Sequence, residues 1–181
     1  MGQVALQVAR VSGARRVIAA CRSSSSQEQA RRLGADAVVP LAESDDVESL
    51  VPRLLEACDS PVDLVLDPLF GVAAAAALRT LAPHGRLVNL GSSASETAIF
   101  DSSTLRSRSL RVLGYTNNEL SREQRAGALL AVAEHARAGR IQLSYDRRPF
   151  DQVGEAWSRQ AGGNAPRRQV LTLRAQAELV L

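Results

Sequence analysis

Apolar residues recur along the chain in two patterns, one with helical spacing and one in short uninterrupted runs. The clearest helical stripe lies at 46–58, where apolar residues fall on one face. The run at 17–20 shows no polar alternation, which is typical of a strand covered on both faces, and a further strand is expected at 62–66. Strands that alternate with helices predict a doubly wound α/β fold with a parallel sheet.

The same patterns place the remaining elements. Further helices are expected at 3–12, 27–33, 72–82, 121–138 and 150–160, and further strands at 37–39, 86–90, 110–115 and 170–173. Ligands of such sheets bind beyond the carboxyl ends of the strands. The candidate binding positions are therefore 21–24, 67–71, 91–93 and 115–118.

Composition narrows the class of protein. The 181 residues are 45% apolar, enough for a packed core, and the net charge is only +3. The 22 basic residues are all arginine and are scattered, and aromatic residues make up 3%, so a nucleic-acid partner is not expected. Cys21 and Cys58 form no paired motif, which favours a reducing cytoplasm. No apolar run approaches the roughly 20 residues of a membrane span, so no membrane partner is expected.

The sequence offers few residues for other chemistry. Cys21, Cys58, His84 and His135 lack the spacing of zinc ligands, so no metal site is expected. There is no G-x-S-x-G elbow for a hydrolase. Tyr115 is a candidate proton donor, although a tyrosine at a strand end more often packs through its ring. The sequence leaves the catalytic residues unknown.

Five short motifs occur in a characteristic order. They are a helix at 1–9, Leu33-Gly34-Ala35-Asp36, the strand and loop at 62–71, the turn and strand at 81–91, and the C-terminal positions 150–171. Together they resemble the medium-chain dehydrogenase/reductase superfamily, in its quinone-oxidoreductase or zinc-binding-dehydrogenase form. The resemblance implies a Rossmann-like domain at 1–173, with a return segment from about 141, and a tail at 174–181.

The resemblance also implies that two parts of the family's pattern have no counterpart in this sequence. These are the first strand and the N-terminal GroES-like catalytic domain, so an N-terminally truncated chain is expected. In the strand order 3-2-1-4-5-6, strand 1 is central. The strands at about 16–20 and 62–67 would each lose a partner. The chain alone is therefore expected to be a poor enzyme that folds poorly or pairs with another chain.

The resemblance assigns a cofactor role to residues near both ends of the dinucleotide. Gly2 would let the pyrophosphate approach a helix N-terminus. Arg22, Ser23 and Ser24 stand where an acid would select NAD, which favours NADP(H); a solvated arginine and a serine cap are the alternative. Asp67 would lie near the adenosine ribose or cap the next helix. Gly91, Ser92 and Ser93 would face the nicotinamide.

These assignments imply hydride transfer from NADPH to a quinone or an α,β-unsaturated carbonyl compound. The alternatives are a fragment of a zinc-type alcohol dehydrogenase or of an enoyl reductase, and a non-catalytic dinucleotide-binding module. A methyltransferase is disfavoured, because no acid follows the second strand. The expected partner is a small-molecule quinone or enone substrate. The sequence leaves undecided whether the chain forms a homodimer.

Overall fold

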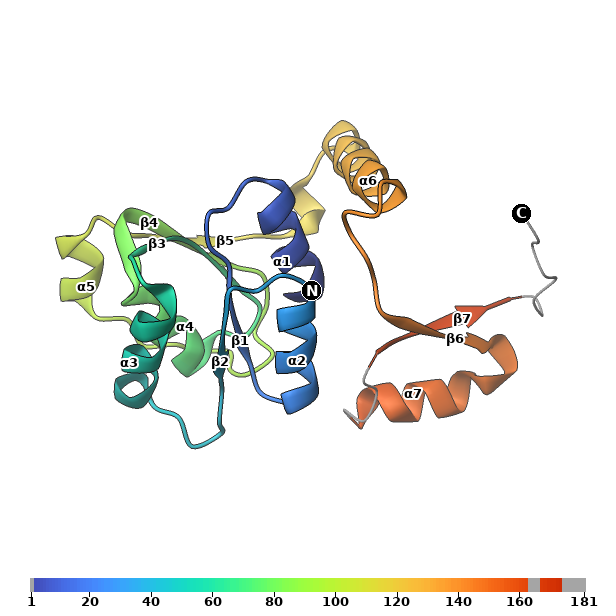
Figure 1. Ribbon diagram of the computed structural model, residues 1–181, viewed down its shortest axis with the longest axis horizontal. Helices are drawn as coiled ribbons and strands as arrows, with labels where there is room; N and C mark the ends of the chain where they lie inside the picture. The colour runs from blue at the N-terminus through green and yellow to red at the C-terminus, as the bar shows by residue number, and fades with distance from the viewer. Residues whose placement is uncertain (1, 163–166, 174–181) are drawn as a thin grey trace. The chain divides into compact units, whose positions relative to one another are not determined.

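The computed structural model describes residues 2–162 and 167–173. The chain divides into two compact units, Met1–Ile141 and Gln142–Leu181. Figure 1 shows both units. The tail expected at 174–181 lies outside the described residues.

The first unit alternates strands and helices along the chain. Its strands are β1 (Ile18–Cys21), β2 (Ala37–Pro40), β3 (Val62–Asp67), β4 (Leu81–Asn89) and β5 (Arg111–Gly114). Its helices are α1 (Gly2–Val11), α2 (Ser24–Arg32), α3 (Val47–Cys58), α4 (Gly71–Leu78), α5 (Ser102–Ser107) and α6 (Arg122–Arg137), with a 3-10 turn η1 (Asn117–Glu119).

Every strand pair described in this unit is parallel, which confirms the predicted α/β class. β1 pairs with β2, and β3, β4 and β5 form a second sheet in that order. Among the described residues β1 and β3 are not hydrogen-bonded to each other. The hydrogen-bonded sheet is therefore interrupted between β1 and β3. These are the two strands, at about 16–20 and 62–67, that were expected to lose a partner.

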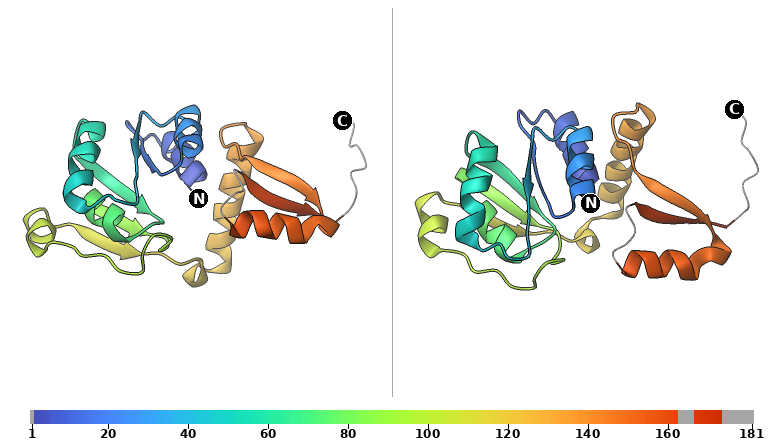
Figure 2. Two further views of the ribbon diagram at one scale, coloured as in Figure 1. Left: turned by 90° about the horizontal axis from the view of Figure 1, so that it is seen from below. Right: turned by 60° about the horizontal axis from the view of Figure 1, so that its bottom comes forward.

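Helices cover the β1–β2 strand pair from both sides. Leu6 of α1 and Ala30 of α2 pack with Val17 and Ala19 at β1, and Figure 2 shows α1 and α2 side by side. On the other side, α3 packs on Val39 of β2. This two-sided arrangement is that of a doubly wound fold.

Helix α4 contributes to the cores of both sheets. Its Ala76 packs with Val39 and the buried leucines of α3, while its Leu78 packs with Leu81 and Leu87 of β4. These α4 and β4 side chains are at most 1% exposed. The two sheets are therefore joined through a helix that packs on each of them.

One face of the β3–β4–β5 sheet stays open. Val65 and Leu87 point toward α4, so their neighbours along the strands point the opposite way. On that opposite face Leu64, Leu66 and Leu113 are 39%, 41% and 44% exposed. An apolar sheet face of this kind is normally covered.

The Leu33-Gly34-Ala35-Asp36 motif has a structural role at the start of β1 and β2. The carboxylate of Asp36 accepts a hydrogen bond from the Val17 backbone N–H at 2.7 Å and forms an ion pair with Arg10. Arg10 also donates to the carbonyl of Gly34 at 2.9 Å. The motif thus links the end of α1 to the beginning of both strands.

We expect Asp36→Asn to destabilise the protein in a pH-dependent way. Hydrogen bonds from Arg10 and Val17 lower the pKa of Asp36 from its ordinary value. A depressed folded-state pKa stabilises the fold above the unfolded value of about 3.9, and this contribution is lost as the pH falls through the folded pKa. Urea unfolding between pH 3 and 7 should show the largest difference from wild type at pH 7.

Glu56→Gln on the exposed surface of α3 is the matched control, and its difference from wild type should be small. If Asp36→Asn lowered the free energy of unfolding equally at pH 3 and pH 7, the ionised carboxylate of Asp36 would not be what stabilises the fold.

The second unit is a parallel strand pair with one helix. It contains β6 (Tyr145–Pro149), the 3-10 turn η2 (Phe150–Gln152), α7 (Val153–Ala161) and β7 (Arg168–Thr172). Ala156 is the buried side chain of α7. Arg148 of β6 donates to Gln169 of β7 at 2.7 Å, and Gln169 donates in turn to Asp146 at 3.1 Å.

Several predicted boundaries were wrong. The helix expected at 72–82 ends at Leu78, and the strand expected to begin at 86 begins at Leu81. The turn residues around His84 lie within β4, where the β3–β4 register shifts. The helix expected at 27–33 already begins at Ser24. Helix α5 and strand β6 were not predicted.

Candidate functional site

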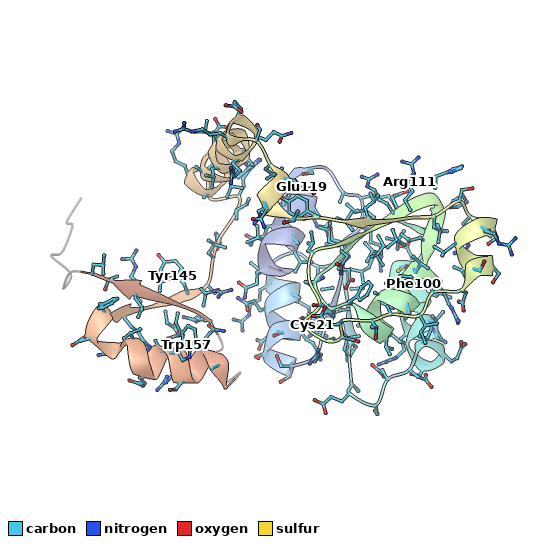
Figure 3. The ribbon with its side chains drawn as sticks, turned by 180° about the vertical axis from the view of Figure 1, so that it is seen from behind. Cys21, Phe100, Arg111, Glu119, Tyr145 and Trp157 are labelled. Atoms are coloured by element: carbon cyan, nitrogen blue, oxygen red, sulfur yellow. The ribbon has the colours of Figure 1, made fainter. Side chains whose placement is uncertain are left out.

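The carboxyl end of β1 presents a cluster of exposed polar residues. Cys21, labelled in Figure 3, ends the strand, and Arg22 follows it with an exposed side chain. Among the described residues no carboxylate lies within ion-pair distance of Arg22. The next acid, Glu28, forms an ion pair with Arg32. The guanidinium of Arg22 is therefore available for an anion.

The two serines differ in their surroundings. Ser23 is the N-cap of α2, and its Oγ accepts from the Ser26 N–H at 3.2 Å. Ser24 begins the helix and is exposed. A backbone N–H at a helix N-terminus and a nearby arginine together favour a negatively charged group.

Cys21 lies beside this cluster. Partial burial raises the pKa of its thiol, and the positive charge of Arg31 opposes that rise. Arg31 thus adds a second positive charge near the end of β1. The thiol itself is kept in its neutral form, which makes a nucleophilic role unfavourable.

Asp67 ends β3 and is only 4% exposed. Its Oδ1 accepts from the backbone N–H groups of Leu69 and Phe70 at 3.0 and 2.9 Å. Helix α4 has Phe70 as its N-cap, without a side-chain cap. The carboxylate therefore holds the loop before the helix, and its role toward a ribose stays a prediction.

The loop after β4 is bonded to the loop after β3. The backbone N–H and the Oγ of Ser93 donate to the Pro68 carbonyl at 3.2 and 3.0 Å. The N–H of Ala94 donates to the Leu69 carbonyl at 2.9 Å. Ser92 donates to Glu96. We call residues 67–71 and 91–95 the paired loops.

The paired loops approach each other closely at Gly71. It has φ of +66°, and a Cβ there would lie 2.8 Å from the Cβ of Ser95. The preceding Phe70 also has positive φ, 61°, and its ring packs edge-on against Phe100 at 6.0 Å. Strained residues of this kind persist only where the surroundings fix them.

Gly2 is the first residue of α1 and is exposed, and a Cβ added there would meet nothing within 4 Å. The start of α1 is tied to α2 by a hydrogen bond from Gln3 to Gln29 at 2.8 Å. The predicted site residues thus fall into two groups. Gly2, Arg22, Ser23 and Ser24 belong to the α1–β1–α2 part, and the others belong to the paired loops.

Two residues with clear structural roles were missed. Gln27 donates from Nε2 to the Arg22 carbonyl at 3.2 Å and so fixes the turn that carries Arg22. Asn89 at the end of β4 donates to Asp67 and Gly91. A single amide in a helix or strand carries no sequence signal for the partners that its side chain finds.

Neither a metal-ligand cluster nor a membrane-spanning helix occurs in the described structure. Within residues 2–162 and 167–173, no three histidine, cysteine, aspartate or glutamate side chains gather as metal ligands do. The prediction of no metal site stays a prediction. In the same part of the chain, no helix is both long and apolar enough to cross a membrane.

Dinucleotide-binding domains have a parallel α/β fold of this kind, with the ligand at the loops that follow the carboxyl ends of the strands. The family model for zinc-binding dehydrogenases matches residues 1–134. The chain therefore belongs to the zinc-binding dehydrogenase family, which confirms the resemblance to medium-chain dehydrogenase/reductases. No curated protein matches the sequence.

Solved structures share the fold. A mycobacterial quinone oxidoreductase has a TM-score of 0.82 at 20% identity, over 94% of this chain and 52% of its own. Benzyl alcohol dehydrogenase from Acinetobacter calcoaceticus has a TM-score of 0.79 at 22% identity, over 96% and 47%. An alcohol dehydrogenase from Aeropyrum pernix has 0.71 at 22%, over 94% and 46%. The chain thus spans about half the length of these proteins.

Proposed function

We propose that the chain is the nucleotide-binding part of an NADP(H)-dependent oxidoreductase that transfers hydride to a quinone or an α,β-unsaturated carbonyl compound. The observation that carries the cofactor choice is the exposed Arg22 at the end of β1, which has no acidic partner among the described residues. An acid at this position would bind the ribose 2′-OH of NAD, whereas an arginine suits a 2′-phosphate. Arg31 adds positive charge nearby.

The comparisons support a nicotinamide cofactor but leave its kind open. One mycobacterial structure with TM-score 0.78 is a complex with NADPH, and an acetophenone reductase from Geotrichum candidum, with TM-score 0.67, is a complex with NAD. The substrate class rests on the resemblance to quinone oxidoreductases. Because both cysteines are free, we also expect a reducing cytoplasm as the compartment.

In this proposal the chain binds and orients the cofactor. When bound, the nicotinamide supplies the hydride. Arg22 and the start of α2 hold the 2′-phosphate, and the N-terminus of α1 at Gly2 faces the pyrophosphate. The paired loops, through Gly91 to Ser93, face the nicotinamide ring. The alternatives are a fragment of a zinc-type alcohol dehydrogenase or of an enoyl reductase, and a non-catalytic dinucleotide-binding module.

We expect Arg22→Ala to weaken NADPH binding by about 10- to 100-fold, because a hydrogen bond to a charged group contributes about 1.5–3 kcal/mol. NADH lacks the 2′-phosphate, so its affinity should change little. Calorimetric titration of both cofactors against both proteins measures the difference.

Arg125→Ala on the exposed surface of α6 is the control for loss of one positive charge. Equal affinity of the wild-type chain for NADH and NADPH would contradict the NADP(H) assignment. Binding of neither would argue against the proposed function as a whole.

A further inference from the structure

Asn89 forms a side-chain link between the paired loops. It is the last residue of β4 and lies opposite Asp67 in the strand register. Its Nδ2 is 3.2 Å from Asp67 Oδ2 and 2.8 Å from the Gly91 carbonyl oxygen. The two amide hydrogens can therefore serve one partner in each loop.

We propose that Asn89 is a positioning residue for the nicotinamide half of the cofactor. It sets the orientation of the backbone from Gly91 to Ser93. The inference rests on the proposed function, which places this backbone at the nicotinamide. It adds a residue whose side chain acts on the cofactor only through the loop.

Peptide planarity turns this hydrogen bond into an orienting device. The Gly91 carbonyl and the Ser92 N–H belong to one planar group and point in opposite directions. A bond from Asn89 to that carbonyl therefore also fixes the direction of the Ser92 N–H. A Cβ at Gly91 would lie 3.4 Å from the Pro68 carbonyl oxygen, so this side of the loop is in van der Waals contact with the other loop.

The link is anchored firmly on its other side. Asp67 is nearly buried, and its Oδ1 already accepts two backbone N–H groups. Loss of the Asn89 side chain would leave Oδ2 of Asp67 without this hydrogen-bond donor, which is costly for a buried carboxylate. The loops would then shift to recover a partner.

The groups proposed for the 2′-phosphate lie on the other strand pair and make no hydrogen bond to this link among the described residues. Arg22 and Ser23 follow β1, which shares no ladder hydrogen bond with β3 or β4 in the described part of the chain. Removal of Asn89 should therefore affect the two halves of the cofactor unequally. A merely structural role would lower the folded fraction and weaken both halves alike.

The test compares NADPH with 2′,5′-ADP, which contains the 2′-phosphate and adenosine but no nicotinamide. Both are titrated calorimetrically against the 181-residue wild type, Asn89→Ala and Asn89→Ser. We expect Asn89→Ala to weaken NADPH about tenfold and to change 2′,5′-ADP less than about twofold. Asn89→Ser should regain part of the loss, because its hydroxyl can donate one hydrogen bond.

Gln160→Ala, which removes an exposed amide from α7, is the control and should leave both affinities unchanged. Equal effects of Asn89→Ala on both ligands, or none on either, would overturn the inference while leaving the proposed function intact. Binding of neither ligand by wild type would overturn both. If Asn89→Ala does not fold, Asn89→Ser decides by the same comparison.

Discussion

Replacing Leu87 by alanine is expected to lower the free energy of unfolding by about 2–5 kcal/mol. Leu87 is 0% exposed in the centre of the β3–β4–β5 sheet, where it packs with Leu78 and Leu81. Truncation removes buried methyl groups and leaves a cavity. Because domains of this size are stable by only about 5–15 kcal/mol, the loss is a large fraction of the total.

Urea unfolding followed by circular dichroism measures this loss. Leu113→Ala on β5 is the matched control, because Leu113 is 44% exposed, and it should cost less than about 1 kcal/mol. Equal losses for the two variants would show that Leu87 is not a central core residue.

The wild-type chain is expected to self-associate through the unpaired edges of β1 and β3 and the exposed apolar face of the β3–β4–β5 sheet. Unpaired strand edges template pairing with another chain, and Leu64 and Leu66 add exposed apolar area beside the edge of β3. The double variant Leu64→Lys/Leu66→Lys should weaken self-association at least about tenfold, since charge on such a strand opposes pairing. Analytical ultracentrifugation over a range of concentrations measures the effect.

Leu129→Lys on α6 is the control, because Leu129 is 71% exposed but lies on a helix. A wild-type chain that is monomeric and melts cooperatively would be evidence against association by these edges. So would a control variant that dissociates the protein as well as the strand variant does.

The strands were predictable where the sequence contains a short, mainly apolar run, as at Val62–Asp67, although one face of that strand is exposed. Helix α5 was not, because Ser102–Ser107 is a short polar segment with no buried residue and therefore no hydrophobic period. Strand β6 was missed for a related reason, since Tyr145–Pro149 consists mainly of polar and charged residues. The early start of β4 was hidden by Pro83 and Gly85, which are typical of turns.

The candidate site could be located from the sequence only as far as the topology dictates. Parallel strands bring their carboxyl ends to one edge, and this placed Asp67 and Gly91 in adjacent loops before their contacts were known. The hydrogen bonds of Asn89 and Gln27 depend on the positions of atoms far apart or on a particular turn. No periodicity or composition encodes such contacts.

The packing of α4 on both sheets has a consequence for how the first unit unfolds. Since no backbone ladder hydrogen bonds join β1 to β3 in the described residues, the packing of α3 and α4 and the polar contacts of Arg15 and Arg16 with the end of α3 and the turn after it couple the halves. Ladder hydrogen bonds break only with the strand they hold, whereas helix packing can loosen by itself. We therefore expect the β1–β2 half to open as a local unfolding unit, with backbone amides that exchange with solvent ahead of those in β3 and β4.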